Sequence, residues 1–434
     1  MPYGARLAAA MARRLGRECV YTPSARLALY LALRRWCRPG GRVLMSPVTD
    51  DVILFVVLAA GLRPVMAPVG VRDGNIDPSA VPEATWRGVD AVLTSNLYGV
   101  PDRTAELRGH CDRLGIPLIE DAAHAIGSHV SGQPVGTFGD AAAFSLSKHV
   151  AAMSGGFLAV EDTRTRRELE RLRDDLLTPR RLRGELASAL RPLARSSVRS
   201  LHLVRPVWGA MRGLGLLERD AYRMDLNAPG LSSRSHRAPD LTVYDPWIRV
   251  DLHDFRRRQG SLFRAQLGLR LAGLDHDLAR RRPGVSLLAA TDWASPPVRD
   301  RTARDGPLPL FRVPLLVEDR DTLVTGLVRH GVVCGYVYDP PLDDYAGPEF
   351  AEPSPAPQAA RWFAAHVLPA DPLQARGIIR ALTRERTAPA RPPAPGTLPA
   401  GTPPATASGA APDTASGAAP DSTPDVTSAD SRGR

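Results

Sequence analysis

Hydrophobic and polar residues in the first 165 positions alternate between helical and strand spacing. From Ser24 to Trp36, apolar residues recur as in an amphipathic helix, and Ser24 stands before them as an N-cap. This alternation predicts an α/β domain with a mainly parallel sheet over residues 1–165, in which ligands bind beyond the carboxyl ends of the strands. Further helices are predicted at Val52–Ala60 and Thr104–Leu114, and strands at Arg42–Met45, Val65–Val69, Ala91–Thr94 and Pro117–Ile119.

The remaining chain has four parts of different character. Residues 166–250 predict a basic helical insertion, since eight arginines stand against one glutamate between Arg180 and Arg212. Residues 251–300 lead back to the junction of the domains through one long helix at 251–285. Residues 301–385 predict a smaller C-terminal α/β domain, with strands at Phe311–Val317 and Val332–Tyr338. Residues 386–434, with TASGAAPD in tandem, predict a disordered tail.

Composition and charge narrow the functional classes. No stretch reaches the roughly 20 apolar residues of a membrane helix, and no signal peptide is evident. The four cysteines are scattered, so we expect neither disulfides nor a metal site, and a cytoplasmic location. The net charge of +10 comes from arginines spread along the chain without a recognition motif, so no nucleic-acid partner is expected. A membrane-surface contact through 180–212 is the less favoured alternative to a solvated insertion.

The basic residues themselves are unusual. Of 56 lysines and arginines, one is a lysine, Lys148. Arginine replaces lysine wherever only positive charge is needed, but it cannot be deprotonated to a nucleophilic amine. The lone lysine therefore indicates either a requirement for its amine or a chance survivor of strong arginine bias, and its surroundings must decide between the two.

Two segments with chemical potential follow predicted strands. Residues 118–124, LIEDAAH, run from a strand into Asp121, which is placed to reach a ligand or to cap a helix. Residues 135–149, VGTFGDAAAFSLSKH, contain a tight turn and then hydroxyls and Lys148. Ser145 or Ser147 can donate to a phosphate while Lys148 forms an imine, and the glycines at 155 and 156 permit close backbone approach.

A third segment, TPSARL at residues 22–27, opens the first strong helix. Exposed N–H groups and the helix dipole make such an N-terminus a site for phosphate. In a pyridoxal-phosphate (PLP) enzyme, an aspartate at a strand end keeps the pyridine nitrogen protonated, so that the ring draws electrons from the substrate. The order of the three segments thus indicates a PLP site.

These segments resemble the DegT/StrS-type aminotransferases, a PLP-dependent family with the type I, aspartate-aminotransferase-like fold. The most specific part is IEDAAHAIGS followed by GTFGDAAAFS and Lys148-His149. Other matching segments are SARLALYLALR, PGGRVLMSP, SNLYGVP and SGGFLAV. The resemblance covers about residues 15–165 and, more faintly, 251–385, and it implies a large domain with a mainly parallel sheet plus a smaller C-terminal domain.

The resemblance also implies a role for each catalytic residue. Asp121 would pair with the pyridine nitrogen, and His124 would lie near the ring hydroxyl. Lys148 would hold PLP as a Schiff base and then move a proton between substrate and cofactor. The family acts on nucleotide-linked keto-sugars, so the implied activity is transamination of a keto-sugar, with glutamate as donor, by a homodimer.

The remaining implied contacts concern the phosphate and the substrate. Ser145 would donate to the PLP phosphate, and Ser24 and Ala25 would form the other half of that phosphate site. Tyr338 and His149 are the candidates for contact with substrate.

The sequence departs from the family pattern at several places, two of which concern the cofactor and its phosphate directly. Asp50, next to Thr49, stands where the family stacks an aromatic ring on the cofactor, and the Asn-Tyr-Arg signature is absent near residues 259–261. These departures leave a second hypothesis open, a non-catalytic PLP-fold protein acting as a regulator or scaffold.

Overall fold

The structure is a computed structural model that describes residues 3–152, 154–179, 223–224, 226–235, 240–249, 254–332 and 334–394. These described residues all belong to one compact unit. The basic segment 180–212 and the tail beyond residue 394 lie outside the described residues, and the domain boundaries expected from the sequence stay predictions.

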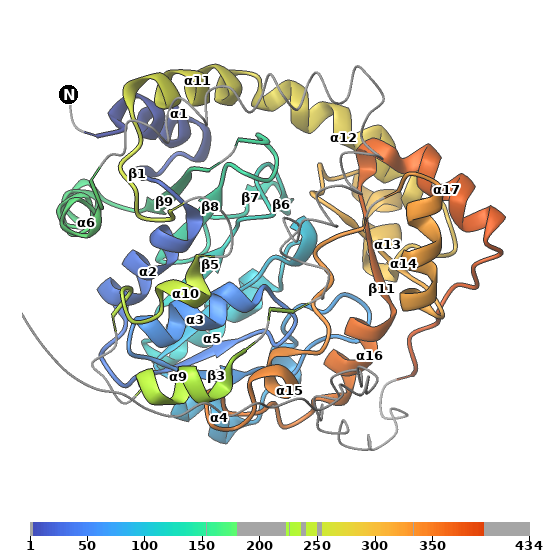
Figure 1. The fold of residues 1–434 in the computed structure, drawn as a ribbon, viewed down its shortest axis with the longest axis horizontal. Helices are drawn as coiled ribbons and strands as arrows, with labels where there is room; N and C mark the ends of the chain where they lie inside the picture. Colours follow the sequence, from blue (N-terminus) through green and yellow to red (C-terminus); the bar gives the residue numbers. More distant parts are fainter. Residues whose placement is uncertain are drawn as a thin grey trace, which may run out of the picture. The chain divides into compact units, whose positions relative to one another are not determined.

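A seven-stranded sheet forms the centre of the unit, with the strand order β1-β9-β8-β5-β4-β2-β3. Every neighbouring pair is parallel except the two pairs that include β9, which runs antiparallel to β1 and β8. The predicted mainly parallel sheet is therefore confirmed (Figure 1). The strands are β1 (Glu18–Thr22), β2 (Arg42–Met45), β3 (Arg63–Met66), β4 (Ala91–Thr94), β5 (Leu118–Asp121), β8 (Ala141–Ser145) and β9 (Gly156–Val160).

Helices cover both faces of this sheet because successive strand residues point to opposite sides. Ala141 and Ala143 of β8 pack in one apolar cluster with α2 (Ala25–Trp36) and α3 (Asp51–Ala59). Ala142 and Phe144 pack in another with α1 (Ala5–Leu15) and α11 (Ser261–Ala272). Further helices around the sheet are α4 (Glu83–Gly88), α5 (Thr104–Leu114), α6 (Thr163–Leu176), α9 (Ala228–Ser235) and α10 (Asp245–Ile248).

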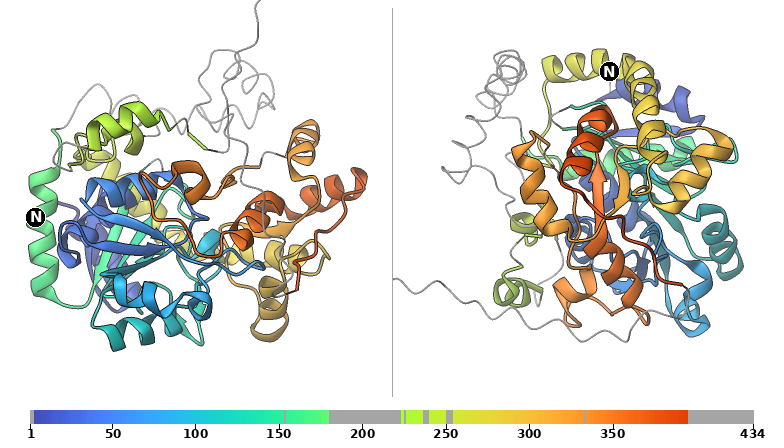
Figure 2. Two further views of the ribbon diagram at one scale, coloured as in Figure 1. Left: turned by 90° about the horizontal axis from the view of Figure 1, so that it is seen from below. Right: turned by 90° about the vertical axis from the view of Figure 1, so that its right-hand side faces the viewer.

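The C-terminal part of the chain builds its own apolar cluster around a small sheet. Strands β10 (Val313–Leu316) and β11 (Val367–Ala370) pair antiparallel. Figure 2 shows the helices of this part in yellow to red beside the large sheet. The helices α12 (Leu274–Ala289), α13 (Pro296–Asp305), α14 (Arg320–Arg329) and α17 (Ala375–Arg384) contribute to its apolar cluster. The helix α16 (Gln358–His366) belongs to a further cluster, and α15 (Leu342–Ala346) packs in the core of the large sheet. A two-stranded hairpin, β6 (His129–Val130) with β7 (Gln133–Pro134), and short 3₁₀ turns at 78–80, 97–99 and 372–374 complete the elements.

Most predicted elements in the first part of the chain are confirmed within a few residues. Helix α2 begins after Ser24, whose side chain accepts a hydrogen bond from the Leu27 N–H at 3.2 Å, as an N-cap does. The strand predicted to end at Ile119 continues through Asp121, so both Glu120 and Asp121 belong to β5 rather than to the following loop.

Two predicted elements of the later chain are wrong. The long helix expected at 251–285 begins only at Ser261 and is interrupted at Gly273, where α11 ends and α12 starts. The strand expected at Val332–Tyr338 is absent among the described residues of that stretch, and Tyr336 has a left-handed backbone with φ 68°. A residue with positive φ cannot continue an extended strand.

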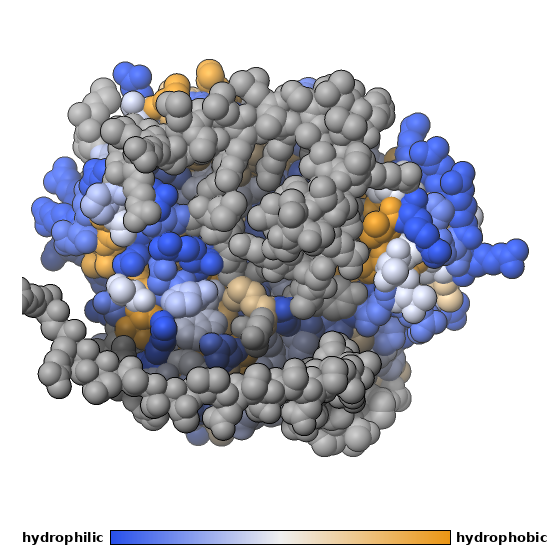
Figure 3. Space-filling model, viewed as in Figure 1, coloured by the Kyte–Doolittle hydropathy of each residue, from blue (hydrophilic) through white to orange (hydrophobic). Residues whose placement is uncertain are grey.

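The described surface is mostly polar, with a few exposed leucines. Hydrophobic residues reach the surface near α11 at the top of the view in Figure 3, where Leu262 and Leu269 are 64% and 78% exposed. None of the helices in the described residues has the length and apolar character needed to cross a bilayer.

Glu120 shows how the sheet holds the turn before β8. Its side chain is fully buried and accepts hydrogen bonds from three backbone N–H groups, those of Gly136, Phe138 and Gly139, at 2.7 to 2.9 Å. Charge-assisted bonds of this kind are stronger than neutral ones. Glu120 therefore fixes the turn from which β8 enters the sheet.

Replacing Glu120 with alanine is expected to destabilise the protein by about 3 kcal/mol or more, because it leaves three largely buried N–H groups without their acceptor. Denaturant unfolding of the Glu120→Ala variant measures this loss. Glu161→Ala is the matched control, since Glu161 is exposed and its removal should cost roughly 0.5 kcal/mol or less. Equal stabilities of the two variants would contradict the structural role of Glu120.

Candidate active site

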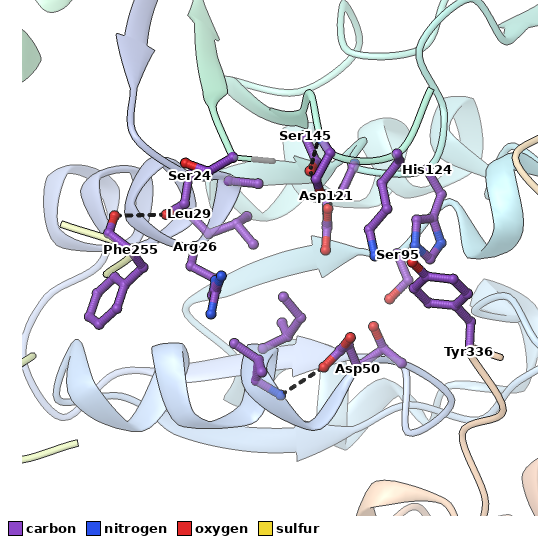
Figure 4. A pocket seen from close by; sticks show the side chains of 18 of the residues that line it. Ser24, Arg26, Leu29, Asp50, Ser95, Asp121, His124, Ser145, Phe255 and Tyr336 are labelled. Atoms are coloured by element: carbon purple, nitrogen blue, oxygen red, sulfur yellow. Dashed lines mark hydrogen bonds between the residues drawn. The ribbon is translucent and has the colours of Figure 1, made fainter. Parts of the chain in front are cut away.

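A cavity of about 440 Å³ lies at the carboxyl ends of the parallel strands. Residues that directly follow β2, β4, β5 and β8 line it, and the N-terminus of α2 closes one end. In Figure 4, Asp121 points into the cavity from one side and Asp50 lies across from it. Ser24 and Phe255 lie at one end, and His124 and Tyr336 lie together at the other. The site is thus where parallel-sheet proteins bind ligands.

Asp121 is the buried carboxylate of this cavity. Its Oδ1 accepts a hydrogen bond from the Ala123 N–H at 2.9 Å, and its carbonyl accepts one from the Asn96 side chain at 3.2 Å. Burial raises the pKa of the Asp121 carboxyl to about 7, the Asp50 charge adds to the rise, and Lys148 opposes it. A cation bound against Asp121 would therefore relieve an unfavourable buried charge.

Lys148 lies in the same cavity, three residues after the end of β8. Its side chain is half-buried, and its Nζ is 4.0 Å from the centre of the Tyr336 ring and 5.6 Å from that of Phe311. Both rings come from the C-terminal part of the chain. The only lysine of the sequence is therefore enclosed between the end of β8 and an aromatic wall.

His124 belongs to that wall. Its ring is stacked on Phe311, with centres 4.8 Å apart, and lies parallel to Tyr98 at 6.3 Å. Burial lowers the pKa of His124 well below its ordinary value, and the Lys148 charge lowers it further. His124 is consequently neutral at physiological pH and can offer a hydrogen bond or a ring face without adding charge.

The end of the cavity near α2 suits an anion. The hydroxyl of Ser24 donates to the Phe255 carbonyl at 2.9 Å while its oxygen caps the helix, so the hydroxyl is already engaged. Ala25 and Arg26, the first residues of the helix, line this end of the cavity, and the first N–H groups of a helix lie at the positive end of its dipole. Gly156 packs against this turn so closely that a Cβ there would lie 2.6 Å from the Ala25 nitrogen. The backbone N–H groups, more than the Ser24 hydroxyl, are therefore suited to phosphate.

The two serines before Lys148 act as a pair. The Oγ atoms of Ser145 and Ser147 are 2.8 Å apart, and both residues line the cavity. Ser145 is buried at the end of β8, whereas Ser147 is exposed. The sequence left open which of the two serines binds the phosphate. Both hydroxyls lie in the cavity that the α2 N-terminus closes, and they differ in that the Ser145 donor is buried and the Ser147 donor is exposed.

The two residues expected to contact substrate lie in different places. Tyr338 lines the cavity and stacks on Tyr98, with ring centres 5.9 Å apart. His149 does not line the cavity. It is buried, with Nε2 3.0 Å from the Pro309 carbonyl, and burial lowers its pKa to about 3. Of these two residues, Tyr338 therefore lies at the cavity, whereas His149 lies outside its lining.

Arg223 is a residue that the sequence did not reveal. Its guanidinium is buried and donates to the carbonyls of Thr49, Pro340 and Tyr338, and it lies 5.6 Å from the Tyr338 ring centre. It therefore ties together two loops that line the cavity. In the sequence it is one of many arginines in 166–250, and no spacing distinguishes it from the others.

The residues present fit PLP. A buried carboxylate suits the protonated ring nitrogen, and the amine of the only lysine in the sequence suits the aldehyde. Helix N–H groups and two hydroxyls suit the phosphate. The rings that line the cavity are those of His124, Phe255, Tyr336 and Tyr338, while Thr49 and Asp50 stand where the resemblance leads one to expect an aromatic.

Comparison with solved structures confirms the predicted fold. The chain is similar to a DegT/DnrJ/EryC1/StrS aminotransferase from Brucella abortus, with a TM-score of 0.60 and 18% identity, over 88% of this chain and 89% of that one. Residues 2–183 match the DegT/DnrJ/EryC1/StrS aminotransferase family. The resemblance noted in the sequence is therefore confirmed over this part of the chain, which contains Asp121, His124, Ser145 and Lys148.

Two curated relatives each match about a third of the chain. A UDP-N-acetyl-3-dehydro-alpha-D-glucosamine 3-aminotransferase from Acidithiobacillus ferrooxidans is 34% identical over 151 residues, which is 34% of this chain and 41% of the relative. An L-glutamine:2-deoxy-scyllo-inosose aminotransferase from Streptomyces kanamyceticus is 33% identical over 161 residues, 36% of this chain and 38% of the relative. The matches thus span about two fifths of each relative's length.

The pKa of Asp121 leads to a stability prediction for the PLP-free protein. Folding raises the pKa of the Asp121 carboxyl from 3.8 to about 7, so the folded protein holds this proton more tightly than the unfolded chain does. The resulting stability is fully present below pH 3.8 and is lost as the pH rises to about 7. Asp121→Asn has no such loss. Urea unfolding measures the free energy of unfolding of the variant and of the parent at each pH. We expect the value of the variant minus that of the parent to be about 2 kcal/mol more positive at pH 8 than at pH 5.

Asp102 provides the matched control. It is also buried, and burial likewise raises its pKa to about 7, but it does not line the cavity. Asp102→Asn should show a similar pH dependence of stability while PLP binding is retained, whereas Asp121→Asn should lose PLP binding. If the Asp121→Asn difference is the same at both pH values, the raised pKa of Asp121 is contradicted.

Proposed function

We propose that the protein is a PLP-dependent aminotransferase that converts a nucleotide-linked keto-sugar, or a related cyclic ketone, to the amine, with glutamate or glutamine as donor. The observation that carries this proposal is the convergence of Asp121 and Lys148 in one cavity whose far end is a helix N-terminus. The substrate class is inferred from relatives that act on a UDP-linked keto-sugar and on 2-deoxy-scyllo-inosose.

Each residue has a distinct task in this proposal. Bound PLP supplies an electron sink for the carbon that bears the substrate amine. Asp121 holds a proton on the ring nitrogen, which keeps that sink effective. Lys148 would hold the cofactor through its Nζ, and as the free amine it would take up and return the proton of the substrate carbon. His124, neutral and stacked on Phe311, orients the ring region without competing for the proton.

The phosphate end and the substrate end are served by different residues. The first N–H groups of α2 and the Ser145 hydroxyl hold the phosphate. Tyr338, held by Arg223, contacts the substrate. The family resemblance also supports a homodimer as the working form.

A non-catalytic PLP-fold scaffold is the alternative, suggested by Asp50 and Thr49 in the position of the expected aromatic. This alternative is not favoured, since a scaffold has no need for the buried carboxylate of Asp121 and the only lysine, Lys148, in one cavity. The two functions differ in the response of bound cofactor to an amino donor.

The first test is absorbance of the purified protein with PLP. The parent should gain the visible band of PLP linked to a lysine, and glutamate or glutamine should bleach it. Lys148→Arg keeps the positive charge but cannot form the link, and no other lysine can replace it, so the variant should lack the band. No band in the parent would overturn the enzyme proposal, and a band that neither donor bleaches would contradict transamination with these donors.

The phosphate contact is tested by serine variants. Ser145→Ala should weaken PLP binding about tenfold or more, because a buried hydroxyl loses its hydrogen bond to a charged group. Ser147→Ala is the matched control and should change the affinity about twofold or less, because water replaces an exposed hydroxyl. Both are measured by PLP titration, and a larger loss in Ser147→Ala would assign the phosphate to that residue instead.

A further inference from the structure

The ring face of Tyr336 is in direct contact with the amine of Lys148. The Nζ atom lies 4.0 Å from the ring centre, which is within the distance at which a cation is attracted to an aromatic face. The next ring, that of Phe311, is 5.6 Å away. Tyr336 rather than Tyr338 is therefore the tyrosine that touches the lysine.

The backbone of Tyr336 is held in an unfavourable conformation to make this contact. Its φ of 68° lies in the left-handed region, which bulky residues rarely adopt and which costs about 1 to 3 kcal/mol. The Tyr98 hydroxyl donates to the Tyr336 carbonyl at 2.7 Å and fixes this peptide from the β4 side of the site. A strained backbone at a ligand cavity is typical of residues whose position matters for function.

The orientation of the Tyr336 ring is fixed by two further rings. Its edge-to-face contacts with Phe311 and His124 have centre distances of 5.1 and 5.7 Å and angles of 77° and 83°. The Arg312 guanidinium is 4.2 Å from the Phe311 centre and bonds to Asp371 at 3.3 Å, which holds the other side of the wall. The face that meets Lys148 is consequently rigid.

We propose that Tyr336 is a positioning residue for Lys148, whose ring face holds the ammonium group beside the cofactor site whenever the lysine is not linked to PLP. This purpose rests on the proposed function, since a Schiff-base lysine must be released and recovered in each turnover. The released amine would take up the substrate proton in its neutral form, and the Tyr336 ring face would then hold the ammonium group so formed at the site until that proton is given up.

The single lysine makes a direct test possible in the PLP-free protein. Acetic anhydride acetylates only uncharged amines, so the parent chain has two reactive groups of this type, Lys148 and the α-amino group, which serves as internal reference. Peptide mass spectrometry gives the ratio of the two rates. Tyr336→Leu removes the ring face and should raise the relative rate at Lys148 about tenfold.

Two matched variants separate the ring contact from simple access. Tyr336→Phe keeps the ring face and should stay within about twofold of the parent. Tyr338→Leu removes another tyrosine that lines the cavity but leaves the Tyr336 ring in place, and it should leave the rate within about twofold of the parent. Tyr336→Met serves in place of the leucine variant if the latter does not fold, as judged by circular dichroism.

Three outcomes would overturn the inference. The first is an unchanged rate in Tyr336→Leu, and the second is an equal rise in Tyr338→Leu, which would indicate access. The third is a rise in Tyr336→Phe as large as in Tyr336→Leu, which would assign the effect to the hydroxyl. Because labelling is measured without PLP, its result is independent of whether the cofactor band appears, and failure of one proposal can be told from failure of the other.

Discussion

The site depends on the pairing of strand β8 with a parallel neighbour on one side and an antiparallel neighbour on the other. The register places Asp121 of β5 opposite Ala143, and Ser145 opposite Gly156 of β9. The first pairing brings the carboxylate to the edge from which the chain continues to Lys148. The second brings the backbone before β9 against the first turn of α2, through the bridge between Ser24 and Gly155. Asp121, Lys148 and the first turn of α2 therefore meet because the pairings of β8 with β5 and with β9 bring them to the same edge of the sheet.

The features of this site that depend on neighbouring residues in the sequence could be predicted from the sequence. Helix α2 follows its cap, and the strands of the parallel sheet show as short apolar runs, because burial between two helix layers leaves little choice of residue. The order of Asp121, Ser145 and Lys148 along the chain then places them at one sheet edge, since parallel strands end on the same side. The single lysine indicated a catalytic amine only in combination with this order of residues.

The parts made by contacts between distant segments were not predictable. Tyr336 lies in a stretch whose apolar spacing suggests a strand, but a hydrogen bond from Tyr98 and two ring contacts impose a left-handed backbone that no local pattern encodes. Arg223 has no distinguishing neighbours in sequence, and its three carbonyl acceptors come from residues 49, 338 and 340. Likewise, His149 follows the lysine directly but is turned away to Pro309.

The two adjacent carboxylates of β5, Glu120 and Asp121, have different roles, since one holds a turn of the fold and the other faces the cavity. Glu120 points to the buried turn before β8, and Asp121 points to the cavity, as successive residues of a strand must. A shift of β5 by one residue would exchange their faces, leaving the turn without its acceptor and the cavity without its acid. A one-residue insertion or deletion within β5 would therefore damage the fold and the site together. A change of length in the short turn at 115–117 before the strand would leave both intact, provided that the pairing of β5 with β4 and β8 is kept.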